Sequence, residues 1–148
     1  MDNFGSIRLL KMKVYNRAYY FLNLKHLEEV LCDPKIPLLW NHPDAETMDP
    51  HNHETIGNVG DIHFIQDDDS KFVDGFYEMT GLTEGMKRVL SEMEERGPIN
   101  VSVEFYWEED DAKYDYWKNC YMVKKIHLTG VAIVRHGACS PTDGCALK

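Results

Sequence analysis

Short apolar segments separated by turn residues recur along this chain, and they favour a fold built mainly from β-strands. The clearest of them is Val101–Trp107, where β-branched and aromatic residues are concentrated. Three consecutive aspartates, 67–69, predict a turn between two such segments, and the charged residues 108–113 predict another. We expect strands at residues 7–15, 36–40, 56–65, 72–79, 101–107, 114–122 and 126–134.

Two segments have the apolar spacing of helices. Residues 83–96 carry an apolar stripe behind a threonine suited to cap the first turn, and Gly97 follows as a stop. A second helix is expected from Asn23, an N-cap residue, through Leu24, Leu27 and Leu31, ending before Pro34. The pattern predicts an α+β fold, with a mainly antiparallel β-sheet or small β-barrel flanked by two or more helices.

The chain length of 148 residues fits one domain, and no linker composition interrupts it. We therefore expect a single domain over residues 1–148, in which residues 137–148 form a loop-rich C-terminal tail. There is no signal peptide and no apolar run long enough to cross a bilayer, so we expect no membrane partner and a chain that stays where it is made.

The net charge of −9 argues against nucleic-acid binding, because an acidic surface repels phosphate backbones. The four cysteines show no CxxC spacing, so we interpret them as reduced thiols. Cys139 and Cys145 leave open a metal-ligand or redox pair, and the aspartates 67–69 leave open a cation site.

Histidines are concentrated between residues 42 and 63, at His42, His51, His53 and His63. One interpretation is a metal site, because His51-Asn52-His53 has a spacing that zinc ligands use and Asp61 or His63 would complete the set. The other is a single general base among loop histidines. Because the segment around His51 has turn composition, the second interpretation is favoured, and we expect no metal and no cofactor.

His42 and Ser102 are the candidate catalytic pair. His42 directly follows the apolar run Pro37–Trp40, where a core strand would hold an imidazole in place as a general base. Ser102 lies in a strongly strand-forming segment, a place that does not favour serine for its own sake. A serine near a positioned histidine can act as a nucleophile. The competing interpretation of each is structural: a buried histidine, and a half-buried serine bonded to a carbonyl.

Several segments taken in order resemble the prohead (capsid maturation) serine proteases of tailed phages, a group similar in fold to the herpesvirus assemblins. The resemblance covers most of the chain and is carried by the order of the segments. These are Tyr15-Asn16-Arg17 with Tyr19-Tyr20, the expected helix 24–31, Leu38-Leu39-Trp40-Asn41-His42-Pro43, Ile56-Gly57-Asn58-Val59, the helix 83–96 leading through Gly97-Pro98-Ile99 into Val101-Ser102, and Leu128–Val134 ending in Gly137-Ala138-Cys139-Ser140-Pro141.

The resemblance implies that Ser102 is the nucleophile and His42 the base. In the family a third catalytic residue lies on the last core strand, but the matching positions here are Gly130 or Ala132, and neither can orient an imidazole. His127 would face the other side of a regular strand and would need a bulge to reach the site. Glu104 shares a face with Ser102 and is the other candidate, and a two-residue site is the third option.

The function implied is that of a serine endopeptidase that cleaves phage scaffold and major capsid proteins during prohead maturation. It would act in the host cytoplasm, inside the immature prohead, and would also cleave its own chain. A homodimer or higher oligomer is left open. Two rival functions are a catalytically inactive assembly or structural virion protein with the same fold, and a metal-dependent hydrolase using His42, His51, His53 and Asp61.

Overall fold

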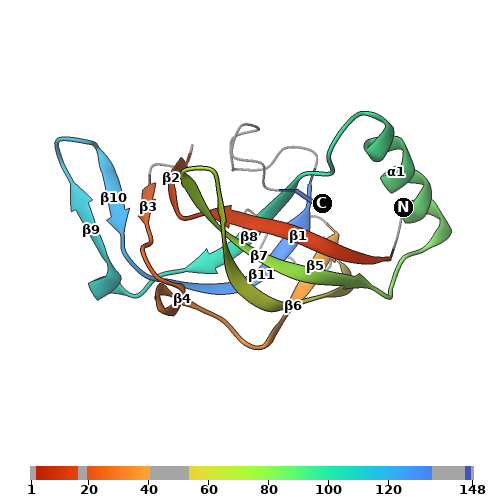
Figure 1. The fold of residues 1–148 in the computed structure, drawn as a ribbon, viewed down its shortest axis with the longest axis horizontal. Helices are drawn as coiled ribbons and strands as arrows, with labels where there is room; N and C mark the ends of the chain where they lie inside the picture. Colours follow the sequence, from red (N-terminus) through yellow and green to blue (C-terminus); the bar gives the residue numbers. More distant parts are fainter. Residues whose placement is uncertain (1–2, 17–19, 41–53, 135–145, 148) are drawn as a thin grey trace.

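The computed structural model describes residues 3–16, 20–40, 54–134 and 146–147. Within these ranges the fold is mostly β-sheet with one α-helix, which confirms the predicted α+β class at that level. The larger sheet has the order β1-β7-β6-β5-β11-β4, and β8 pairs with the other edge of β11 (Figure 1). Its strands are β1 (Phe4–Lys11), β4 (Val30–Leu31), β5 (Lys35–Trp40), β6 (Glu54–Asp67), β7 (Ser70–Met79), β8 (Val101–Tyr106) and β11 (Ile126–Ile133).

This larger sheet curls into a half-barrel around the hydrophobic core. Two of its outer strands, β1 and β8, are linked by the C-terminal residues Ala146 and Leu147. Leu147 bridges Ile7 of β1 and donates its N–H to the carbonyl of Ile99, at 3.0 Å, while Ala146 bridges Asn100. Because Ala146 and Leu147 are both buried, the end of the chain takes part in closing the core.

A smaller sheet has the order β2-β3-β10-β9. Its strands are β2 (Lys13–Asn16), β3 (Tyr20–Asn23), β9 (Ala112–Asp115) and β10 (Cys120–Val123). The β9–β10 hairpin extends from the half-barrel at the end opposite to the helix α1 (Figure 1). Most strand pairings in the described ranges are antiparallel, as predicted, and the exceptions are β3–β10, β4–β11 and β5–β11.

The helix predicted from Asn23 to Leu31 is wrong, so the described chain has one α-helix in place of the two or more expected. The segment instead forms the end of β3, a short 3-10 helix at Leu27–Glu29, and β4. A helix this short is marginal by itself, whereas the two strands pair with β10 and β11, and Leu24 and Val30 are buried in the core. The Glu29 carboxylate accepts the N–H groups of residues 25 and 26, which further stabilises the non-helical backbone.

The single strand predicted over residues 114–122 is also wrong, because the chain turns back within it. Asp115 Oδ1 accepts the N–H groups of Trp117 and Lys118, at 2.9 and 3.1 Å, and Asn119 has a φ of 54°. Asparagine tolerates this left-handed conformation and aspartate stabilises such turns through its side chain. The result is the β9–β10 hairpin, with Trp117 fully exposed at its tip.

The helix α1 (Glu84–Glu95) confirms the prediction for residues 83–96. Thr83 is its N-cap and accepts the N–H of Met86 at 3.2 Å, while Leu90 is buried. Gly97 follows with a φ of 134°, a conformation that side chains disfavour, so the helix ends there as predicted.

Replacing Thr83 by alanine is expected to lower the free energy of unfolding by about 1 kcal/mol, because the Met86 N–H loses its acceptor. Urea denaturation followed by circular dichroism measures the change. Thr80→Ala, an exposed position before the helix, is the matched control and is expected to leave the midpoint unchanged. Equal midpoints for the Thr83 variant and the native chain would contradict the capping role.

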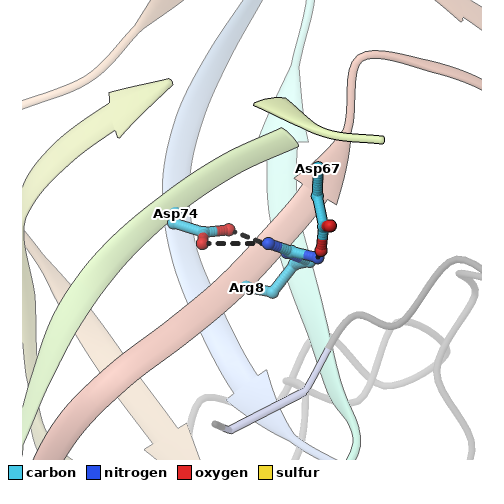
Figure 2. Close-up of polar contacts among 3 residues, drawn as sticks. All are labelled: Arg8, Asp67 and Asp74. Atoms are coloured by element: carbon cyan, nitrogen blue, oxygen red, sulfur yellow. Dashed lines mark hydrogen bonds and ion pairs between the residues drawn. The ribbon is translucent and has the colours of Figure 1, made fainter. Parts of the chain in front are cut away.

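A buried ion pair joins β1 to β7. Arg8 bonds Asp74 through Nε–Oδ1 at 3.0 Å and Nη2–Oδ2 at 3.3 Å, and Asp67 contacts Nη1 at 3.3 Å (Figure 2). The guanidinium also stacks over the ring of Phe72. Burial lowers the pKa of Arg8, but the two carboxylates outweigh this and leave that pKa raised, so the guanidinium stays charged.

Candidate active site around Ser102

Ser102 lies on β8 and faces away from the main hydrophobic core. It is in register with Ala132 of β11, which is in register with Leu39 of β5. Residues in register across a sheet share a face, so these three side chains form one row. Leu39 and Ala132 belong to a small apolar cluster with Val134, separate from the main core that contains the flanking Val101.

The Ser102 side chain is buried, since the residue is only 8% exposed. Among the described residues, no side-chain hydrogen bond or ion pair involves it. A buried hydroxyl without a partner is unfavourable by about 1–3 kcal/mol, so native proteins rarely keep one without a reason. The hydroxyl group therefore has donor and acceptor capacity for a residue outside the described ranges or for a substrate.

Glu104 shares this face with Ser102, as predicted from their spacing on the strand. It is in register with Gly130, and a methyl group placed on Gly130 would lie 3.5 Å from Glu104 Oε2. The carboxylate thus lies over the glycine of the neighbouring strand. Thr129 Oγ1 donates to the Glu104 carbonyl at 3.0 Å, which holds this part of β8 against β11. Glu104 therefore supplies a carboxylate from β8 itself, two residues from Ser102 on the same face.

His127 reaches the same face because β11 contains the required irregularity. The register shifts between Leu128 and Gly130, which places His127 opposite Tyr106. Their rings stack, with centroids 4.5 Å apart and planes 5° from parallel. Tyr106 is four residues along β8 from Ser102, a distance of about 13 Å in a strand. His127 is therefore on the correct face but too far from Ser102 to bond to it.

A cavity of about 310 Å³ opens beside the His127–Tyr106 stack. Here β4 and β5 both pair with the same edge of β11, and residues 32–34 connect them without joining the sheet. Cys32, Lys35 and Thr129 also line the cavity. The cavity lies on the face that carries Ser102 and Glu104, about 13 Å along β8 from the hydroxyl.

Burial raises the pKa of the Cys32 thiol, and the neighbouring Asp33 carboxylate raises it further. A raised pKa means a smaller thiolate fraction at any pH below it, and the thiolate is the reactive form. We therefore expect iodoacetamide at pH 8 to alkylate Cys32 more slowly in the folded chain than in the urea-unfolded chain, and Asp33→Asn to speed the folded reaction. Peptide mapping by mass spectrometry measures both rates, and equal rates for folded and unfolded chains would contradict the assigned shift.

His42, the predicted base, lies outside the described residues. The described chain reaches Trp40 at the end of β5, which is in register with Ile133 and, through it, with Val101 at the start of β8. Leu39 and Ser102 are separated by the single strand β11, so their backbones are about 10 Å apart. The strand that leads to His42 therefore ends at the same end of the sheet as Ser102.

The residues proposed for a metal site are only partly described, because His51 and His53 lie outside the described ranges. Asp61 and His63 are on β6, where the His63 ring stacks on Phe76. His63 Nδ1 lies 2.6 Å from the Asp61 carbonyl oxygen, which can only accept, so Nδ1 carries the proton. Within the described part of the chain, no group of three or more metal-ligating residues occurs.

The aspartate turn at residues 67–69 does not form an independent cation site, because Asp67 is bonded to Arg8. The prediction that the cysteines are reduced thiols can be compared with the structure for two of the four. Cys32 and Cys120 are free thiols, while Cys139 and Cys145 lie outside the described residues. No helix in the described ranges has the length and apolar character needed to span a membrane.

No known protein-family model, curated protein or solved structure matches this chain.

Proposed function

We propose that this chain is a serine endopeptidase in which Ser102 is the nucleophile and His42 the general base. The observation that carries the proposal is the Ser102 hydroxyl, which is buried, has no partner among the described residues, and lies two strands from the end of β5. His42 follows Trp40 by two residues, and two residues of extended chain span about 7 Å. That reach is sufficient to bring an imidazole from the end of β5 to Ser102.

Glu104 is the proposed third catalytic residue. By the resemblance the orienting residue would come from the last strand, where the matching positions are Gly130 or Ala132, and the Glu104 carboxylate lies over Gly130. Because Glu104 and Ser102 are two residues apart on one face of β8, both can contact one imidazole placed above them. A carboxylate in this place would fix the tautomer of His42 and stabilise its protonated form.

The proposed reaction is acyl transfer. His42 removes the Ser102 proton as Oγ attacks a peptide carbonyl, and the C–N bond then breaks as His42 returns the proton to the departing amine. Water, with His42 again as base, attacks the acyl-serine ester, which releases the carboxylate product and restores the hydroxyl. Backbone N–H groups that stabilise the oxyanion would contribute about 100- to 1,000-fold each.

The sequence resemblance supplies the proposed substrates: scaffold and major capsid proteins, cleaved inside the immature prohead in the host cytoplasm. The geometry adds a site for substrate side chains, because the cavity beside His127 lies about 13 Å from Ser102, the length of about four extended residues. A substrate strand laid along β8 from Ser102 would place a side chain there.

Mass spectrometry of coexpressed scaffold and capsid proteins tests the proposal. The native chain is expected to produce defined cleavage products, whereas Ser102→Ala and His42→Ala are expected to produce none. Ser91→Ala, at an exposed position of α1, and His63→Ala, on β6, are the matched controls for a serine and a histidine, and both should retain processing. Equal processing by native chain and Ser102→Ala would refute the peptidase, and loss of processing in His51→Ala with bound zinc would favour the metal-dependent hydrolase.

The burial of Ser102 and the glycine at residue 130 also favour a second candidate, a non-catalytic assembly or structural virion protein. A fluorophosphonate probe separates the two candidates, because it labels only an activated serine. The endopeptidase predicts labelling of the native chain that is lost in Ser102→Ala. The non-catalytic protein predicts no labelling of either chain and normal shell assembly with Ser102→Ala.

A further inference from the structure

A second cavity, of about 350 Å³, lies where the chain passes between the two sheets. Three segments form its walls: residues 11–12 at the end of β1, residues 24–26 after β3, and residues 69–71 at the β6–β7 turn. None of these residues belongs to the face that carries Ser102. Its volume falls in the range of sites that hold small organic ligands.

The walls of this cavity are tied to one another by their backbones. The Met12 N–H donates to the Lys71 carbonyl at 2.9 Å, and the Leu24 N–H donates to the Met12 carbonyl at 3.0 Å. The Met12 and Leu24 side chains are themselves buried in the main core. The three segments therefore have fixed positions relative to one another, which is the property that a preorganised site needs.

Each wall contributes a cationic side chain to a protein that is strongly acidic overall. The first provides Lys11, the second provides Lys25 and the titratable His26, and the third provides Lys71 with the Ser70 hydroxyl. Asp69 is the one carboxylate among the described residues that line the cavity, although the chain as a whole has a net charge of −9. Like charges gathered around one cavity repel each other, and an anion placed between them relieves that repulsion.

We propose that this cavity binds a phosphate monoester of a small organic group. A phosphate ester carries a charge of about −1.5 to −2 at pH 7, and lysine binds phosphate as a point charge. The Ser70 hydroxyl adds a hydrogen-bond donor to the phosphate oxygens. The methylene groups of the lysine side chains offer an apolar surface for the organic group.

Titration of the ¹⁵N-labelled full chain with phenyl phosphate, followed by amide NMR, tests this proposal. We expect saturable shifts at residues 25, 26, 70 and 71, with a dissociation constant on the order of 1 mM or below. Inorganic phosphate should bind more weakly, because it makes no contact with the apolar surface, and phenol should not bind. The double variant Lys25→Gln/Lys71→Gln should bind phenyl phosphate at least about tenfold more weakly.

The matched control is Lys118→Gln/Lys124→Gln, which changes the net charge equally at exposed lysines outside the cavity. It is expected to bind phenyl phosphate like the native chain. Equal affinity of the two double variants, or the absence of saturation at concentrations on the order of 10 mM, would overturn the site. Equal affinity for inorganic phosphate and phenyl phosphate would overturn the ester as its ligand.

Discussion

In the proposed peptidase, replacing Glu104 by glutamine is expected to lower the rate of peptide cleavage by about 10⁴-fold, as loss of the acid does in a serine-protease triad. The amide keeps the shape of the side chain but has no charge, so it can neither stabilise a protonated His42 nor select its tautomer. Cleavage of a scaffold-derived peptide, followed by chromatography, measures the rate. Glu92→Gln is the control, because this carboxylate is exposed on α1 and belongs to neither the face of Ser102 nor the cavity beside His127.

A compensating substitution makes this prediction more specific. In the Glu104→Gln background, Gly130→Glu would place a carboxylate on β11, at one of the two positions, Gly130 or Ala132, where the proposed resemblance implies a third catalytic residue. A Cβ at residue 130 meets its nearest neighbours at 3.5 Å, an ordinary contact, so the backbone accommodates it. The double variant is expected to cleave faster than Glu104→Gln alone. Full activity of Glu104→Gln, with no gain from the second change, would exclude Glu104 from catalysis.

Replacing Arg8 by methionine is expected to lower the free energy of unfolding by about 3–5 kcal/mol, the largest loss of stability predicted for this chain. The change keeps an apolar side chain over Phe72 but removes the guanidinium that bonds the Asp74 carboxylate, which is 2% exposed. A buried charge that has lost its partner is strongly unfavourable. Urea denaturation monitored by tryptophan fluorescence measures the difference.

Two further variants distinguish the buried pair from general loss of an arginine. Arg88→Met, on the exposed side of α1, is expected to change the free energy of unfolding by less than about 0.5 kcal/mol. Arg8→Met/Asp74→Leu is expected to recover part of the loss, because it removes the stranded charge. An Arg8→Met chain as stable as Arg88→Met would show that the pair contributes nothing to stability.

The elements predicted correctly from the sequence are those whose signals are local. Thr83 and Gly97 mark the two ends of α1, and the apolar segments at 36–40, 101–107 and 126–134 correspond to β5, β8 and β11. Thr83 accepts a backbone N–H of the first turn, and Gly97 allows the backbone to leave the helix. Each effect is confined to neighbouring residues and depends on no distant contact. The common face of Ser102 and Glu104 follows in the same way from the alternation of side chains along a strand.

The errors occurred where distant partners decide the conformation. The helical spacing of Leu24, Leu27 and Leu31 is present in the sequence, but pairing with β10 and β11 favours strands there. The hairpin within residues 114–122 forms because β10 pairs with both β9 and β3. The intrinsic helix or strand propensity of a residue contributes little free energy, and backbone pairing together with core burial outweighs it.

The strand-rich class, the one long helix, and the position of Ser102 and Glu104 on one face could all be derived from residue patterns alone. Two features emerged only from the folded chain: the bulge after Leu128 turns His127 to this face yet leaves it remote from Ser102, and Glu104 lies over Gly130. A register shift and a contact between strands join residues that are distant in sequence. Their pairing is selected by the packing of the whole sheet, which no local pattern encodes.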